Sequence, residues 1–155
     1  MTPNPAYIRA LQDGVRESPY PALIGMRIAE LAFDRCRIEL DLRRDHLQPF
    51  GIVHGGVLAT LIDTATFWAA FLRIPDDAGL VNVDLKLNYL KAVSHGHLYA
   101  VGECLRAGRQ ISYTVASVYD AAGELVAHGT STVMTLPGKG LKIGVPKFLD
   151  ATIAE

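Results

Sequence analysis

The sequence predicts one α+β domain, in which a curved antiparallel sheet wraps around a single long helix. Residues 54–73 form an apolar stretch of about five helical turns, and Asp63 is the only charge inside it. A helix that is apolar on nearly every side is either buried in a domain or spans a membrane. Runs that alternate apolar and polar residues flank the stretch on both sides, as half-buried strands do. The glycines at its start, the internal carboxylate and these flanking strands favour a buried core helix.

Length and charge narrow the class of protein. A chain of 155 residues can bury one core without disulfides or metals, so we expect a single domain over residues 1–155. The net charge is −1 with both signs mixed, which argues against a nucleic-acid partner and against an anionic membrane surface. Cys36 and Cys104 both fall in strand-like runs, and no signal-type segment precedes the domain. We therefore expect a reduced, cytoplasmic protein.

The chain before the central helix predicts one short helix and two strands. Asn4-Pro5 is a cap residue followed by proline, which predicts a helix over about residues 5–18 that ends at the prolines of residues 18–21. Strands follow near residues 26–32 and 37–43, and in the second strand apolar residues alternate with charged ones. One face of the sheet is therefore buried and the other is hydrated.

The chain after the central helix predicts four antiparallel strands. Residues 81–89 alternate most strictly, and further strands are expected near residues 97–105, 110–119 and 124–136. The turns at residues 106–109 and 120–123 are short, so consecutive strands must pair antiparallel. The sheet then has about six strands. The core covers about residues 20–136, and residues 137–155 form an irregular tail.

One sheet cannot cover every side of so apolar a helix, so we expect a second copy of the chain to cover the rest. The strand over residues 81–89 is a candidate edge that pairs with its twin across a twofold axis. A homodimer, and a dimer of such dimers, is the expected assembly.

The position of Asp63 requires an explanation, because burying an unpaired carboxylate costs several kcal/mol. One interpretation is structural: the side chain bonds Thr60 or Thr66, or it caps backbone groups where the helix packs on the sheet. The other is chemical, because buried carboxylates with perturbed pKa values gather at functional sites. The helix alone leaves both open.

The residues that surround Asp63 carry a family resemblance. The run QPFGIVHGG at residues 48–56, followed by Asp63, resembles the signature of the hotdog-fold acyl-CoA thioesterases of the PaaI-like, phenylacetate-degradation group. Residues 88–90, 108–109 and 120–132 are similar to that family too, so the resemblance covers about residues 20–136. It implies a hotdog fold, an acyl-CoA substrate and active sites at a dimer interface. Ala92 departs from the proline of many relatives, in a turn without chemistry.

The residues themselves support the same chemistry. Thioester hydrolysis places negative charge on the carbonyl oxygen, and backbone N–H groups at a helix N-terminus can stabilise that charge. Gly55 and Gly56 are placed to do this, or else they only form a tight turn with positive φ. Gly55 and Asp63 are separated by about 12 Å along one helix, too far to act on one carbonyl group. Two antiparallel helices from two subunits can bring them together.

The resemblance and the residue types suggest roles for several other residues. The resemblance suggests that Gln48 holds the thioester carbonyl or the water, and that Asn82 orients water. His54 is expected to close the helix start rather than act as a base. Phe67, with Phe50, Trp68 and Phe71, is a candidate for the acyl pocket, although aromatic residues at helical spacing are more often core. Arg106 and Arg109 are candidates for the phosphates of coenzyme A, or are solvated turn charges.

Several alternatives stay open at this stage. Asp63 is either a general base for water or a nucleophile that forms an anhydride. A hotdog dehydratase or hydratase would use His54 with Asp63, and a non-catalytic acyl-CoA binding protein would need neither. The sequence contains no phosphate-binding glycine loop, no Gly-x-Ser-x-Gly elbow and no zinc-type spacing, so we expect no cofactor and no metal. The acyl group, aromatic or aliphatic, is not determined.

Overall fold

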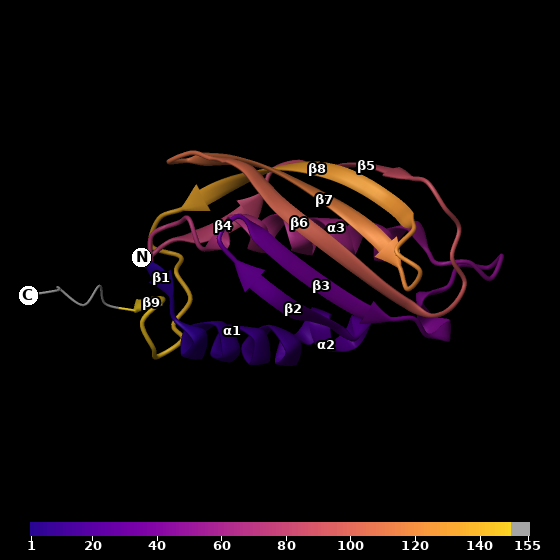
Figure 1. Cartoon of the computed structure of the whole chain (residues 1–155), viewed down its shortest axis with the longest axis horizontal. Coiled ribbons are helices and arrows are strands. Elements are labelled where there is room, and N and C mark those ends of the chain that lie inside the picture. Colours follow the sequence, from indigo (N-terminus) through magenta and orange to yellow (C-terminus); the bar gives the residue numbers. More distant parts are fainter. Residues whose placement is uncertain (150–155) are drawn as a thin grey trace, which may run out of the picture.

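The computed structural model of the chain describes residues 1–149 and contains a seven-stranded antiparallel sheet curved around one helix, α3 (Gly55–Phe71) (Figure 1). The strand order is β2-β3-β6-β7-β8-β4, and β5 also pairs with β8. The predicted α+β class and the wrapped helix are confirmed. Residues 150–155 of the predicted tail lie outside the described residues.

The elements follow the expected order along the chain. The helices are α1 (Pro5–Glu17), α2 (Pro19–Ile24), a 3-10 turn η1 (Arg44–His46) and α3. The strands are β1 (Thr2–Pro3), β2 (Met26–Ala32), β3 (Arg35–Asp41), β4 (Gly79–Asn82), β5 (Lys86–Tyr89), β6 (His97–Ala107), β7 (Ile111–Asp120), β8 (Leu125–Leu136) and β9 (Phe148–Leu149). The elements α2, η1, β1 and β9, which are all short, are not predicted by the sequence patterns.

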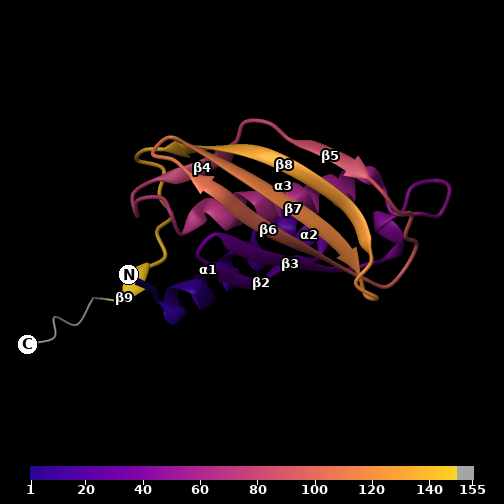
Figure 2. The same ribbon diagram turned by 45° about the horizontal axis from the view of Figure 1, so that its top comes forward.

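The core lies between α3 and the concave face of the sheet, as Figure 2 shows when the sheet is tilted forward. Ten of the residues of α3 are buried, and they meet buried side chains of β3, β6, β7 and β8. Gly102 of β6 allows the closest approach, because a Cβ atom there would lie 2.1 Å from the carbonyl oxygen of Ala65. The absent side chain therefore sets how closely the helix sits on the sheet.

The predicted strand over residues 81–89 is divided into β4 and β5 by a bulge. Both segments pair with β8, but Asn82 lies opposite Val133 whereas Lys86 lies opposite Thr130, so one extra residue is inserted. Asp84 stabilises the bulge, because its carboxylate accepts the Thr132 N–H at 2.8 Å. A one-residue slip exchanges the two faces of a strand. The strict alternation of the sequence is therefore not one continuous face.

The short N-terminal helix is confirmed, with Asn4 as its cap and Pro5 at its first position. The prolines after it do more than end it, since Ser18 closes α1 and α2 begins at Pro19. Serine followed by proline also predicts a helix start, whereas the prediction above uses these prolines only as a helix end.

The predicted irregular tail contacts both the N-terminal strand β1 and the C-terminal end of α3. Its residues 137–147 cross from β8 over the end of α3, and β9 then pairs with β1 at the N-terminus (Figure 1). Lys147 is 2% exposed, and its Nζ donates to the carbonyl oxygens of Phe71 and Ile74, each at 2.8 Å. The tail therefore caps the C-terminal end of the central helix.

The apolar α3 is too short to cross a bilayer. Within residues 1–149, no helix has the length and apolarity that a membrane span requires.

Candidate active site

Asp63 lines a small cavity on the open side of α3. The cavity has a volume of about 270 Å³ and is bordered by Tyr20, Ala59, Thr60, Thr64 and Leu85 as well. Tyr20 comes from α2, and its hydroxyl forms a hydrogen bond of 2.7 Å with the Thr60 hydroxyl. Sequence reasoning missed Tyr20, because α2 itself was not expected and nothing local links it to a helix forty residues away.

The carboxylate of Asp63 has no partner among residues 1–149. Burial raises its pKa above the ordinary value, and no opposing charge or hydrogen bond lowers it within residues 1–149. Thr66 donates to the backbone oxygens of Ile62 and Asp63, not to the carboxylate, and Thr60 is bonded to Tyr20. The structural explanation, a hydrogen bond from one of these threonines, is therefore wrong. The carboxylate is left open to a ligand or to a second subunit.

The N-terminus of α3 presents one free amide. His54 is the cap, and its Nδ1 accepts the Gly56 N–H at 2.8 Å, as expected for a residue that closes the helix start. The Gly56 amide is therefore occupied. The Gly55 N–H donates to no acceptor within residues 1–149, so it is available to an anion. Neither glycine has a positive φ, which excludes the tight-turn explanation for this pair.

Gly55 lines a second cavity, of about 440 Å³, together with Gln48, Leu58, Tyr89 and the segment from Leu90 to Val93. The Tyr89 ring lies against the start of the helix, and its hydroxyl donates to the Gly55 carbonyl oxygen at 3.3 Å. A Cβ atom at residue 55 would lie 2.9 Å from that ring, so only glycine fits here without a shift. The Gln48 side chain turns back, and its Oε1 accepts the Phe50 N–H.

Asp63 and Gly55 therefore do not share a cavity within one chain. They are eight residues apart on one straight helix, which corresponds to about 12 Å. His54 is not among the residues that border the Asp63 cavity, and its Nδ1 accepts the Gly56 N–H, so one chain does not form the His–carboxylate pair that a dehydratase would need.

Asn82 lies beneath Asp63 rather than in the open cavity. Its Nδ2 donates to the backbone oxygen of Asp63 and the Thr66 hydroxyl at 3.2 Å, and to the Ser131 hydroxyl at 3.0 Å. Its Oδ1 is buried and is the one buried side-chain oxygen or nitrogen without a partner in the described part of the chain. The bulge after β4 explains why this polar residue faces the helix. In this chain Asn82 holds the backbone of Asp63.

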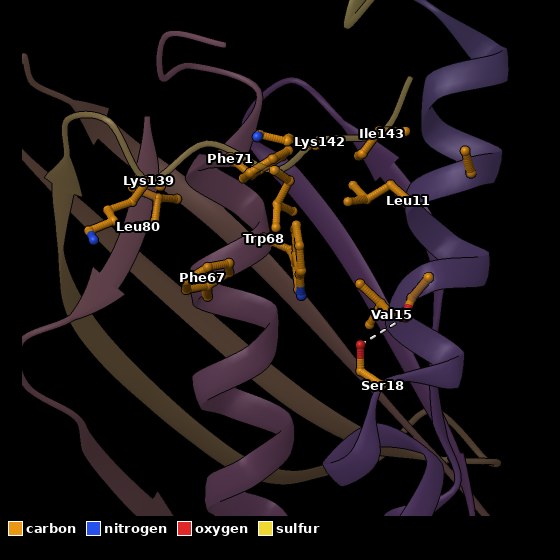
Figure 3. Close-up of a pocket in the computed structure, with 14 residues that line it drawn as sticks. Leu11, Val15, Ser18, Phe67, Trp68, Phe71, Leu80, Lys139, Lys142 and Ile143 are labelled. Atoms are coloured by element: carbon orange, nitrogen blue, oxygen red, sulfur yellow. Dashed lines mark hydrogen bonds between the residues drawn. The ribbon is translucent and has the colours of Figure 1, made fainter. Parts of the chain in front are cut away.

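The aromatic residues divide between a pocket and the surface. Phe67, Trp68 and Phe71 line a third cavity, of about 540 Å³, with α1 and residues 139–143 on its other side (Figure 3). Phe50 borders none of these three cavities, and 91% of its area is exposed at the tip of a turn. Its exposure follows from Gly51, which adopts a positive φ and turns the loop outwards.

Arg106 and Arg109 are exposed and border neither the Gly55 cavity nor the Asp63 cavity. The β6–β7 hairpin that carries them begins near the C-terminal end of α3. The Cys104 N–H donates to the Asp34 carbonyl oxygen, and the Asp34 carboxylate binds Arg73 just after that helix. Within one chain they lie at the end of α3 opposite Gly55.

Residues 1–149 contain no group of three or more His, Cys, Asp or Glu side chains placed to hold a metal ion. The available chemistry is that of a half-buried carboxylate, an open amide N–H and apolar cavities.

Comparisons with known proteins place this architecture in a family. The family described as the Thioesterase superfamily matches residues 50–127. A proofreading thioesterase of Cronobacter turicensis is 31% identical over 108 residues, which cover 64% of this chain and 78% of that protein. A solved thioesterase family protein from Silicibacter pomeroyi has a TM-score of 0.77 and 29% identity, covering 85% of this chain and 99% of the other.

A solved thioesterase from Haemophilus influenzae has a TM-score of 0.76 over 82% of this chain and 88% of its own, and at 22% identity it shows the hotdog fold. The matched family segment includes the start of α3 and Asp63, the same residues that carry the predicted chemistry. The chain belongs to the thioesterase superfamily, and it is a thioester hydrolase with the hotdog fold.

Proposed function

We propose that this protein hydrolyses acyl-CoA thioesters at a site shared by two subunits of a homodimer. Asp63 of one subunit acts on the thioester carbon, and the Gly55 N–H of the other stabilises the carbonyl oxygen. The observation that carries the proposal is the separation of these two groups. The Asp63 carboxylate and the Gly55 N–H line separate cavities, and neither has a hydrogen-bond partner among residues 1–149. About 12 Å of helix lies between them.

The chemistry follows from this pairing. Asp63 takes a proton from a water molecule whose oxygen attacks the carbonyl carbon, or the carboxylate attacks that carbon itself. In the second route the loss of the thiolate leaves an anhydride, which water cleaves in a later step. In both routes the carbonyl oxygen gains negative charge, which a donor at a helix N-terminus stabilises. The C–S bond then breaks, and the coenzyme A thiolate leaves and takes up a proton. Gln48 borders the same cavity as Gly55 and is suited to hold the carbonyl oxygen or the water.

The remaining site residues support this arrangement in different ways. Asn82 acts through the backbone of Asp63, so it is a positioning residue. His54 acts by capping α3 and so orients the Gly55 amide. Arg106 and Arg109 are exposed cations, and contact with the phosphates of coenzyme A would require the second subunit to bring them to the Gly55 cavity.

The test is release of free thiol from a panel of aromatic and aliphatic acyl-CoA thioesters, measured for the wild type, Asp63→Asn and Asp63→Ala. We expect turnover on some members, with kcat lower by about 10²–10⁴-fold in both variants, since the loss of a positioned acid or base has that effect. Gel filtration and circular dichroism confirm that fold and assembly are retained. Turnover that is indifferent to Asp63 would contradict the proposed role, and no thiol release from any member would contradict the substrate class.

A further inference from the structure

The largest described cavity lies one helical turn beyond Asp63. Phe67 and Phe71 follow Asp63 at intervals of four residues, so the three side chains share one stripe of α3. The cavity continues from this stripe to α1 on the facing side, and residues 139–143 close its third side (Figure 3). Most of its lining residues are apolar, Ser18, Lys139 and Lys142 are the polar ones, and its lining contains no carboxylate. Such a space suits an apolar occupant.

Gly14 leaves room for that occupant. It stands on the face of α1 that carries the buried Tyr7 and Leu11, and it lines the cavity. A Cβ atom added to Gly14 would meet no atom within 4 Å. Glycine inside a helix destabilises it relative to alanine, so this position favours open space over helix stability.

We propose that this cavity binds the distal end of the acyl group, and that the protein prefers medium-chain acyl thioesters. The inference rests on the proposed function of Asp63. Asp63 and Phe71 are about 12 Å apart along α3. An extended chain advances about 3.5 Å over three bonds, so an acyl group of about eight to twelve carbons spans from the reacting carbon to the far end of the cavity. Phe67 lines the cavity and is one helical turn from Asp63, so it is the first aromatic residue of the cavity wall after Asp63 along α3.

The structure provides its own reporter for occupancy. Trp68 is the only tryptophan of the chain, it lines the cavity, and its ring packs edge-on against Phe67 and Phe71 at centroid distances of 4.9 and 4.8 Å. An apolar ligand in the cavity must therefore change the surroundings of the one indole. Fluorescence of Trp68 measures binding without any turnover.

The experiment compares Gly14→Leu, which fills the cavity, with Gly14→Ala, which restores helix propensity and adds only one methyl group. For the wild type and Gly14→Ala we expect saturable Trp68 fluorescence changes with decanoate and none with butyrate. Gly14→Leu should bind decanoate at least about tenfold more weakly, because it removes the space of two or more methylene groups. Ala10→Phe, one turn earlier on the same wall, repeats the test should Gly14→Leu fold poorly.

Activity gives the second readout. We expect kcat/KM of the wild type to rise from butanoyl-CoA to decanoyl-CoA. Gly14→Leu should lose about tenfold on decanoyl-CoA while it keeps butanoyl-CoA hydrolysis within about twofold of the wild type. An equal loss on both substrates, or an unchanged chain-length profile, would overturn the proposal while the thioesterase function stands. If no thioester is hydrolysed but decanoate binding is lost in Gly14→Leu, the pocket stands as a fatty-acid site and the proposed function fails.

Discussion

Asp63 is a residue at which stability and activity oppose each other. Burial raises the pKa of its carboxyl group above 3.8, and no hydrogen bond or ion pair offsets this within residues 1–149. A carboxyl group with a raised pKa binds more protons in the folded than in the unfolded state. The free energy of unfolding therefore falls as the pH rises from about 3.8 through the raised value. At neutral pH the ionised side chain is destabilising.

We therefore predict that Asp63→Asn melts at a higher temperature than the wild type at pH 7.5, while it loses hydrolysis. The gain should be a few degrees, because 1 kcal/mol shifts Tm by about 2–4 °C in a domain of this size. Differential scanning calorimetry at pH 7.5 and pH 4 checks the sign, since the gain should shrink at pH 4, where a larger fraction of the wild-type carboxyl group is protonated. A lower Tm of the variant at both pH values would show that the carboxylate is structurally satisfied.

The same raised pKa predicts that kcat/KM of the wild type falls with decreasing pH before an ordinary aspartate would titrate.

At the scale of elements, the tail and the central helix depend on each other. The last carbonyl groups of a helix lack intrahelical donors, and a lysine beside them is favoured by the helix dipole. Lys147 supplies two such bonds from the residue just before β9, and its Nζ also lies 4.6 Å from the centre of the Phe71 ring. The tail thus packs against the core, whereas the sequence predicts only an irregular end.

We predict that Lys147→Met lowers the free energy of unfolding by about 1–3 kcal/mol, because two buried carbonyl groups lose their donor. Lys142→Met, at an exposed position of the same tail, is the matched control and should leave stability within about 0.5 kcal/mol. Urea unfolding followed by circular dichroism measures both. Equal effects of the two substitutions would mean that the cap contributes nothing.

The pH dependence of this cap has a defined sign. Burial lowers the pKa of Lys147 from 10.5 to about 8, so between these values the unfolded chain binds more protons than the folded one. The stability of the wild type relative to Lys147→Met should therefore rise from pH 8 to pH 10.5.

At the scale of the whole molecule, the proposed site would be complete only in a dimer. The proposed second copy would use the β4–β5 edge, where Val81 is 39% and Val83 58% exposed. Apolar side chains on an unpaired edge strand are a liability unless another chain covers them. The bulge that turns Asn82 inwards also leaves these two valines pointing outwards.

Mixed dimers test the shared site directly. Asp63→Asn and Gly55→Pro are each expected to be inactive, the second because proline removes the N–H. Proline is well suited to the first helical position after the extended His54. Gly55→Ala is the control, because it makes a similar contact with Tyr89 but keeps the donor.

Co-refolding the two inactive variants should restore about a quarter of wild-type activity, since half of the randomly paired dimers then contain one intact site of two. Activity that stays absent in the mixture, with heterodimers demonstrated by mass spectrometry, would place both groups of each site in one subunit.

The sequence by itself determined the fold class, the long buried helix and most strand positions, because hydrophobic periodicity and caps act over a few neighbouring residues. It also singled out Asp63 and Gly55. Eight residues of helix, at about 1.5 Å each, are enough to keep these two groups apart. Asn4-Pro5 and His54 act as the local caps that their positions indicated.

Only the tertiary structure decided what these residues face. The bulge at Asp84 reverses the faces of a strand that looked continuous, and it directs Asn82 to the backbone of Asp63. Tyr20 and Lys147 bond to α3 from segments 40 or more residues away in the chain, and Gly14 faces α3 across a cavity. Such contacts depend on how distant segments pack together, and no local pattern of residue types encodes that packing.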